Sequence, residues 1–256
     1  MTTVGSVQFD EIGHWSELKL EIVEKYGAAY TTALSNARNL KKIYIDGYSG
    51  AGVHVSRRTG VQVKGSPARA LKVSPPFDGF YFIDMDASRT AHLKTLCRDR
   101  SDVVILTGDA NVELTKEVLP KIHFRKFNRA LCLLDPYGLH LDWEVMQLAG
   151  QSQAVDMFLN FPVMDMNRNA IWKYPAGVPQ DGVERMTRFW GDESWKKVAD
   201  NLPLHRRHHS HRPRGRVCHG AAGRSLRGRP RCGGRVSCCA GACAIGLLAT
   251  ASCRSI

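Results

Sequence analysis

The sequence predicts an α/β domain built on a mostly parallel β-sheet with helices on both faces. Two observations lead to this prediction. Five short apolar runs alternate with segments of helical periodicity, and every run ends in a polar or glycine-rich segment. Strands that alternate with helices pair in parallel, and the helices then cover both faces of the sheet. Ligands bind such sheets outside the carboxyl ends of the strands. We therefore expect the functional site where the five runs end.

Helical and extended segments follow one another in a regular order. Apolar residues recur at three- and four-residue steps from His14 to Ala37, which predicts an amphipathic N-terminal helix. Gly65-Ser66-Pro67 predicts a second helix start, with Ser66 as the N-cap and Pro67 in the first turn. The predicted strands are residues 43–45, 80–83, 103–106, 130–134 and 154–161. The helices predicted between them are residues 67–73, 87–98, 111–119 and 143–149. This order indicates a Rossmann-like sheet.

Charge divides the chain into residues 1–203 and residues 204–256. The net charge of +12 comes from 36 Lys and Arg against 24 Asp and Glu. Eleven of the Arg lie in residues 204–256, which hold no Lys, Asp or Glu, so residues 1–203 carry 25 cations against 24 acids, a net of +1. A basic body that would bind nucleic acid by charge alone is therefore excluded.

The composition of residues 204–256 is dominated by Arg, Gly, Ala, Ser, Cys and His, without apolar periodicity. This amino-acid composition is typical of a GC-rich gene translated in a shifted reading frame, and it predicts a disordered or non-native tail. Two alternatives stay open: a basic arm that binds phosphate backbones, or a zinc site made from the Cys and His residues. The cysteines show no two matched ligand pairs, so we expect no metal site.

The N-terminus has no basic region followed by an apolar run, and no apolar run reaches the length of a membrane span. Cys97 and Cys132 lie singly in apolar segments, which is typical of small buried side chains in a reducing compartment. We therefore expect a cytoplasmic protein that does not associate with a membrane.

The first candidate motif is the segment DGYSGAG, residues 46–52, directly after the first predicted strand. Gly50 and Gly52 permit a tight turn that a ligand can approach closely, and Asp46 can accept a hydrogen bond from it. The third glycine of a dinucleotide-binding pattern is missing, because Val55 stands at its position. An ordinary tight turn is the alternative.

Acidic residues follow the second and third predicted strands. Asp84 is placed to accept hydrogen bonds from ribose hydroxyls, and Asp109 to accept one from the amine of an adenine. Asp also favours helix N-caps, so each can instead cap the helix that follows it, and this is the preferred interpretation for Asp86. The sequence alone does not separate the two roles.

Asp135-Pro136-Tyr137-Gly138 follows the fourth predicted strand. Enzymes that methylate an amino nitrogen of a base need an acceptor to orient that nitrogen and an aromatic ring to stack on the extruded base. Asp135 or the Pro136 carbonyl can be the acceptor, and Tyr137 the stacking ring. A proline-containing turn is the alternative. Residues 160–162, Asn-Phe-Pro, are expected to line the same cleft.

The motifs YIDGYSGAG, GSPARAL, FYFIDMD, LTGDAN, LLDPYG, FLNFP and FWGDESW occur in this order. Together they resemble the bacterial three-Cys-motif partner proteins, over roughly residues 15–195. That family is similar to class I methyltransferases and is named for its association with a protein that carries three clustered cysteines. The tail cysteines here are not that motif.

The resemblance implies a methyltransferase-type domain over residues 1–203 with S-adenosylmethionine as cofactor. The cofactor-binding residues would be Asp46, Gly50, Gly52, Asp84 and Asp109. The catalytic residues would be Asp135, Pro136 and Tyr137. The implied activity is methyl transfer to a nucleic acid; the alternative is a non-catalytic subunit that works through its three-Cys partner. Two features depart from the class: only one proline precedes Tyr137, and the sixth and seventh strands are not found.

Overall fold

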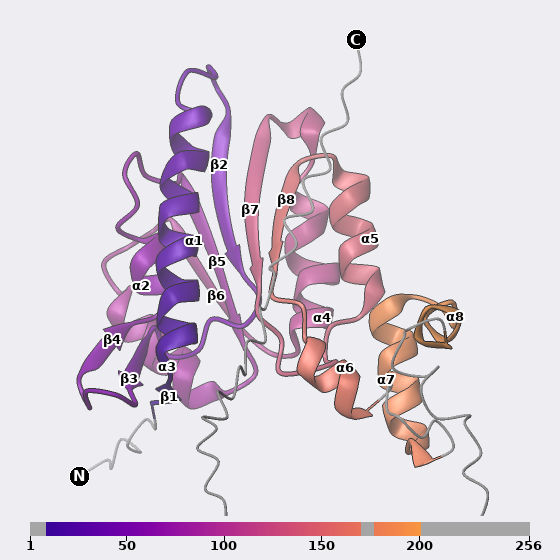
Figure 1. Cartoon of the computed structure of the whole chain (residues 1–256). Helices are drawn as coiled ribbons and strands as arrows, with labels where there is room; N and C mark the ends of the chain where they lie inside the picture. Colours follow the sequence, from indigo (N-terminus) through magenta and orange to yellow (C-terminus); the bar gives the residue numbers. More distant parts are fainter. Residues whose placement is uncertain (1–8, 170–176, 201–256) are drawn as a thin grey trace, which may run out of the picture.

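The computed structural model describes residues 9–169 and 177–200. Its centre is a five-stranded sheet in which every neighbouring pair is parallel, with helices on both sides (Figure 1). The strands are β2 (Lys41–Asp46), β5 (Gly79–Asp84), β6 (Val103–Thr107), β7 (Asn128–Leu134) and β8 (Val155–Leu159). The predicted fold class is therefore confirmed. Residues 204–256, predicted to form a tail, and the proposed boundary at residue 203 lie outside the described residues.

The strand order in this sheet is β6-β5-β2-β7-β8. Counted along the chain, this is the order 3-2-1-4-5 of a Rossmann-like sheet. The chain reverses its direction of travel across the sheet between β2 and β7, which are direct neighbours. Loops leaving these two strands diverge to opposite sides, and the gap between them is where such sheets bind ligands.

Eight α-helices surround the sheet in the described residues. They are α1 (His14–Ala33), α2 (Ser66–Ala70), α3 (Ala87–Leu96), α4 (Ala110–Glu113), α5 (Trp143–Ser152), α6 (Val163–Asn169), α7 (Gln180–Trp190) and α8 (Trp195–Asp200). A π-helical turn, η1 (Leu114–Val118), continues α4, and two 3-10 turns follow at η2 (Leu119–Lys121) and η3 (Phe124–Lys126).

Alternation of side chains along the strands gives the sheet two apolar faces. Tyr44, Phe80 and Phe82 pack on one face with residues of α1, α2 and α3. Ile45 and Ile83 pack on the other with residues of α4, η1, α5, α7 and α8. Figure 1 shows α1 and α5 on opposite sides of the strands. Both faces are thus covered, as a parallel sheet requires.

A second, three-stranded sheet was not predicted. It consists of β1 (Glu11–Ile12), β3 (Val53–Ser56) and β4 (Gln62–Lys64) in the order β1-β3-β4. β1 is parallel to β3, and β3 and β4 form an antiparallel hairpin. The sheet brings the N-terminal segment beside the chain that follows the Gly50 turn, and so adds one wall to the site described below.

The structure corrects several predicted boundaries. α1 ends at Ala33 and not at Ala37. Gly65, not Ser66, is the N-cap of α2, and Ser66 is the buried first residue of the helix. The helix predicted over residues 111–119 keeps α geometry only to Glu113 before it widens into the π turn. α6, α7 and α8 lie beyond the last strand, where no helix was predicted.

Candidate functional site

A cleft of about 610 Å³ opens at the carboxyl edge of the central sheet. Its floor comes from the turn after β2 and from the ends of β7 and β8, and its walls come from α1 and the small sheet. A volume of this size is typical of cofactor and small-molecule sites. The cleft lies at the switch point between β2 and β7, which is the place that the fold predicts for a ligand.

Asp46, the last residue of β2, lies below the cleft with only 1% of its surface exposed. Its Oδ1 accepts a hydrogen bond from the Tyr48 N–H at 3.2 Å. Its Oδ2 has no hydrogen-bond partner of normal geometry in the described part of the chain, although the Ser66 hydroxyl is near enough to lower the pKa. Burial outweighs these contacts and raises the pKa of Asp46 to about 7. The nearby Asp135 and Asp84 act in the same direction.

The two glycines of the turn have different surroundings. Gly50 lines the cleft with φ at +61°, and the nearest atom to a side chain added there would be His54 Cε1 at 3.8 Å. Gly52, with φ at +78°, faces the core, and an added Cβ would lie 3.0 Å from Leu93 Cδ1. Gly50 is therefore placed to meet a ligand. Gly52 does not line the cleft and permits close packing of the turn on α3.

Asp84 ends β5, and its carboxylate holds the turn from behind. Oδ2 accepts the Gly50 N–H at 2.9 Å, and Oδ1 accepts the Asp86 N–H at 2.9 Å. Asp86 is the N-cap of α3, as the sequence predicts, because its side chain accepts the N–H groups of Ser88 and Arg89. Asp84 does not itself line the cleft.

Asp109 is exposed and is the N-cap of α4, where its side chain accepts the Asn111 N–H at 2.8 Å. It does not line the cleft. It lies close enough to Tyr48, a cleft residue, to contribute to the raised pKa of that phenol, whose main cause is burial. The capping role that the sequence leaves open for Asp109 is thus observed.

Asp135 follows β7 and lines the cleft. The Lys19 ammonium of α1 donates to both carboxylate oxygens, at 3.1 Å to Oδ1 and 2.8 Å to Oδ2. The Asn160 amide, at the end of β8, donates to Oδ1 at 2.6 Å. Groups from two separate parts of the chain therefore fix the direction of one carboxylate.

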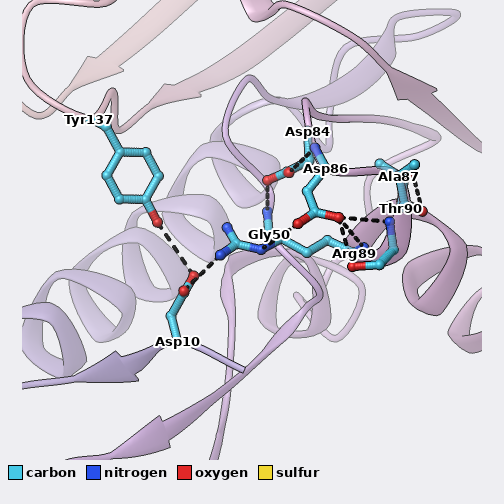
Figure 2. Close-up of polar contacts among 9 residues, drawn as sticks. Asp10, Gly50, Asp84, Asp86, Ala87, Arg89, Thr90 and Tyr137 are labelled. Carbon is cyan, nitrogen blue, oxygen red and sulfur yellow. Dashed lines mark hydrogen bonds and ion pairs between the residues drawn. The ribbon is translucent and has the colours of Figure 1, made fainter. Parts of the chain in front are cut away.

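Pro136 and Tyr137 continue from Asp135 along the cleft. Tyr137 is 68% exposed, and its hydroxyl donates to Asp10 Oδ2 at 3.4 Å. Asp10 also forms an ion pair with Arg89 of α3, at 2.7 Å. Figure 2 shows the Arg89 guanidinium between Asp10 and Asp86, with Tyr137 on the far side of Asp10. The N-terminal segment is thus tied to both the third helix and the loop after β7.

The structure brings Gly50, Asp135, Pro136 and Tyr137 together in one cleft, with Asp46 beneath it. Several cleft residues had no predicted role in binding a ligand: Trp15, Lys19, His54 and Ser66. Burial lowers the pKa of His54, and its Nδ1 has no hydrogen-bond partner among the described residues. The only signal for His54 was its position just after the predicted glycine turn, and the only signal for Ser66 was its predicted place at a helix start. For Lys19 and Trp15, the sequence predicted a helix and nothing about a contact with the cleft.

None of the helices in residues 9–169 and 177–200 is long and apolar enough to cross a membrane. Over the same residues, no group of three or more His, Cys, Asp or Glu side chains is arranged to hold a metal ion. Cys97 and Cys132 are both buried free thiols, as expected.

Comparison with known proteins gives no family. No family model matches the chain, and no curated protein matches it. Among solved structures, the protein LPL1258 from Legionella pneumophila, described under the family model DUF519, is similar at 13% identity with a TM-score of 0.45. The similarity covers 58% of this chain and 68% of that chain. A likeness of this size says nothing about activity, and the motif resemblance described above stays a resemblance.

Proposed function

We propose that the protein binds S-adenosylmethionine in this cleft and transfers its methyl group to a nucleic acid, at an amino nitrogen of a base. One observation carries the proposal: the Gly50 turn after β2 and the Asp135–Tyr137 loop after β7 line the same cleft at the switch point of the sheet. In a Rossmann-like sheet this is where a nucleotide-type cofactor binds.

The chemistry of the cleft fits this cofactor. S-Adenosylmethionine carries a positively charged sulfonium and an ammonium group, and bound here it would supply the activated methyl group. Asp135 presents its carboxylate oxygens to the cleft, where they already pair with Lys19. The buried Asp46 would add a second negative charge below the cleft when it ionises, above about pH 7. The open space at Gly50 leaves room for close approach of the adenosyl part.

Asp84 and Asp109 are the less direct part of the proposed cofactor site. Each already accepts backbone N–H groups. A carboxylate offers about four lone-pair sites, so Asp84 still has acceptor capacity for ribose hydroxyls. Its bond to the Gly50 N–H also fixes the turn against which the cofactor would lie. Asp109, an exposed helix cap, is the weakest member of the set.

The acceptor side of the cleft would act mainly by orientation. Asp135, held by Lys19 and Asn160, can accept a hydrogen bond from the amino group of a base and direct its nitrogen lone pair. The Pro136 carbonyl is a second candidate acceptor. The exposed Tyr137 ring offers a flat surface on which an extruded base can stack.

A methyl-transfer assay tests the proposal. Methyl-labelled S-adenosylmethionine is incubated with the protein and with DNA and RNA pools, and label in the nucleic acid is counted. We expect transfer by the wild type and a loss of about 10²-fold in Asp135→Ala, because orientation of the acceptor fails. Asp99→Ala removes an exposed carboxylate outside the cleft and serves as the control. Equal rates in Asp135→Ala and Asp99→Ala would contradict the assigned role.

A second candidate function is a non-catalytic subunit that associates with a three-Cys-motif protein. It is favoured by two facts about Asp84 and Asp109: neither lines the cleft, and both already accept backbone N–H groups. Co-expression of the two chains tests it. A stable co-purifying pair without methyl transfer to any nucleic acid would support this candidate and oppose the first.

A further inference from the structure

Positive charge is concentrated in the chain between Gly47 and Phe77. This stretch holds five Lys and Arg and no Asp or Glu, although residues 1–203 as a whole are almost neutral. The five cations are Arg57, Arg58, Lys64, Arg69 and Lys72. The stretch forms the β3–β4 hairpin and α2, which lie together on the side of the molecule that also carries the N-terminal part of α1 (Figure 1).

Two of these cations occupy the turn of the hairpin. Arg57 and Arg58 directly follow β3, and both are exposed. Arg57 lines the cleft, and its guanidinium donates to the Glu11 carbonyl at 3.3 Å. The hairpin therefore places positive charge at the mouth of the cleft itself.

A second pair of cations lies at the base of the hairpin. Lys64 pairs with Val53 at the end of β4, and Lys72 follows α2. Their ammonium groups are close enough that Lys72 lowers the pKa of Lys64, and Glu24 only partly offsets this. Two exposed ammonium groups this close repel each other, and a bound anion would relieve the repulsion.

Carboxylate partners do not cancel this charge. Glu24 forms an ion pair with Arg69. In the described part of the chain, Arg57, Arg58, Lys64 and Lys72 form no ion pair with a carboxylate. The floor of the cleft carries no such excess, since Asp135 pairs there with Lys19 and Asp46 lies buried below it. The positive charge without a carboxylate partner is thus gathered on the hairpin and after α2, and Arg57 extends it to the cleft.

We propose that Arg57, Arg58, Lys64 and Lys72, the hairpin surface, bind the phosphodiester backbone of the nucleic-acid strand whose base enters the cleft. That the bound strand also places its base in the cleft rests on the proposed function. Phosphate binding by the hairpin surface does not require methyl transfer. Nucleic-acid backbones carry a negative charge at every residue and are recognised by exposed Arg and Lys.

The test is a titration by fluorescence anisotropy with fluorescein-labelled single-stranded 20-mers of DNA and RNA, over a range of salt concentrations. The variant carries Arg57→Gln, Arg58→Gln, Lys64→Gln and Lys72→Gln. We expect its Kd to rise at least tenfold near 0.1 M salt. The slope of log Kd against log salt should fall by up to about 3, since each lost phosphate contact on a single strand removes roughly 0.7.

A matched control removes four exposed cations from the opposite, amino edge of the sheet: Arg38→Gln, Lys41→Gln, Arg125→Gln and Lys126→Gln. Its Kd should change less than twofold. All proteins keep residues 204–256, so the eleven Arg of that segment contribute equally. Should the quadruple hairpin variant not fold, the single variants Arg58→Gln and Lys72→Gln give the same test with a slope change of about 0.7 each.

Equal losses in the hairpin variant and the control would overturn the inference. So would binding to phosphatidylserine vesicles without binding to either oligonucleotide. A separate titration with S-adenosylmethionine distinguishes the two proposals. If the protein binds oligonucleotides through the hairpin surface but does not bind the cofactor, the proposed methyl transfer is contradicted. The proposed role of the hairpin surface is then still supported.

Discussion

The Lys19 ammonium on α1 lies 2.8 Å from Oδ2 of Asp135, and 116 residues of sequence separate the two partners. The ion pair ties the first helix of the chain to the loop that follows β7, at the cleft. Its side chains are 35% and 42% exposed. Pairs this exposed contribute little to stability, about 0–1 kcal/mol, so the contact matters more for the geometry of Asp135.

Lys19→Met separates these two roles. The free energy of unfolding should change by less than about 1 kcal/mol in urea titrations. The kcat of methyl transfer should fall about tenfold with little change in KM for the cofactor, because Asp135 loses one of the groups that orient it. Lys25→Met, which removes a cation paired with Glu21 on an exposed part of α1, is the control. A large loss of stability with unchanged kcat would show a structural role.

Asp46→Asn should make the protein more stable at high pH. The folded state holds the Asp46 proton more tightly than the unfolded chain, because the pKa rises from 3.8 to about 7 on burial. The stability that this group contributes is therefore complete below about pH 4 and is lost as the pH rises through 7.

Urea unfolding of the two proteins at pH 5 and pH 8 measures this effect. The advantage of Asp46→Asn over the wild type should grow by about 3 kcal/mol between pH 5 and pH 8, out of roughly 4 kcal/mol over the whole titration. Taking the difference between the two proteins cancels the titration of His54 and other groups. An advantage independent of pH would contradict the raised pKa.

Among the glycines with positive φ, the loss of stability on substitution by Ala should increase with the crowding around the added Cβ. Gly60→Ala has φ at +68° and nothing within 4 Å of the added Cβ, so it should cost only the backbone strain, roughly 1–2 kcal/mol. Gly52→Ala adds a 3.0 Å contact with Leu93 and should cost roughly 1–3 kcal/mol more. Urea unfolding compares the two variants. Similar losses would show that Leu93 moves aside freely.

Tyr137 offers a test of base stacking that leaves the fold intact. Tyr137→Phe loses the contacts of the hydroxyl with Asp10 and Arg89 and keeps the ring, so oligonucleotide affinity should be unchanged. Tyr137→Ala should weaken affinity roughly 5- to 150-fold, since stacking contributes about 1–3 kcal/mol per base. Anisotropy titrations measure both. Equal losses in Phe and Ala would assign the effect to the hydroxyl.

The sequence identified the sheet and one edge of it. Five apolar runs predicted the five central strands, and polar residues at their ends placed Asp46 and Asp135 at one edge of the sheet. The five central strands can be predicted from short stretches of sequence, because a strand that is buried on both faces must be apolar along its length. The two-residue β1 has no such signal, since its pairing with β3 depends on where the rest of the chain has already placed both segments.

Roles that depend on distant contacts could not be predicted. Nothing local in α1 indicates that Lys19 would meet Asp135, because the contact exists only once the helix packs on the sheet. Asp84 and Asp109 show a different limit. An Asp at a strand end can bind a ligand or accept backbone N–H groups, and the same residue type at the same position serves both. Only the coordinates show which hydrogen bonds it makes.

The most direct measurement is an isothermal titration of the wild-type protein with S-adenosylmethionine, with Gly50→Val as the comparison. We predict one binding site in the wild type and none in the variant, because a branched side chain at Gly50 would fill the space where the cofactor approaches the turn. No heat of binding in the folded wild type, or equal affinity in Gly50→Val, would contradict a cofactor site between β2 and β7.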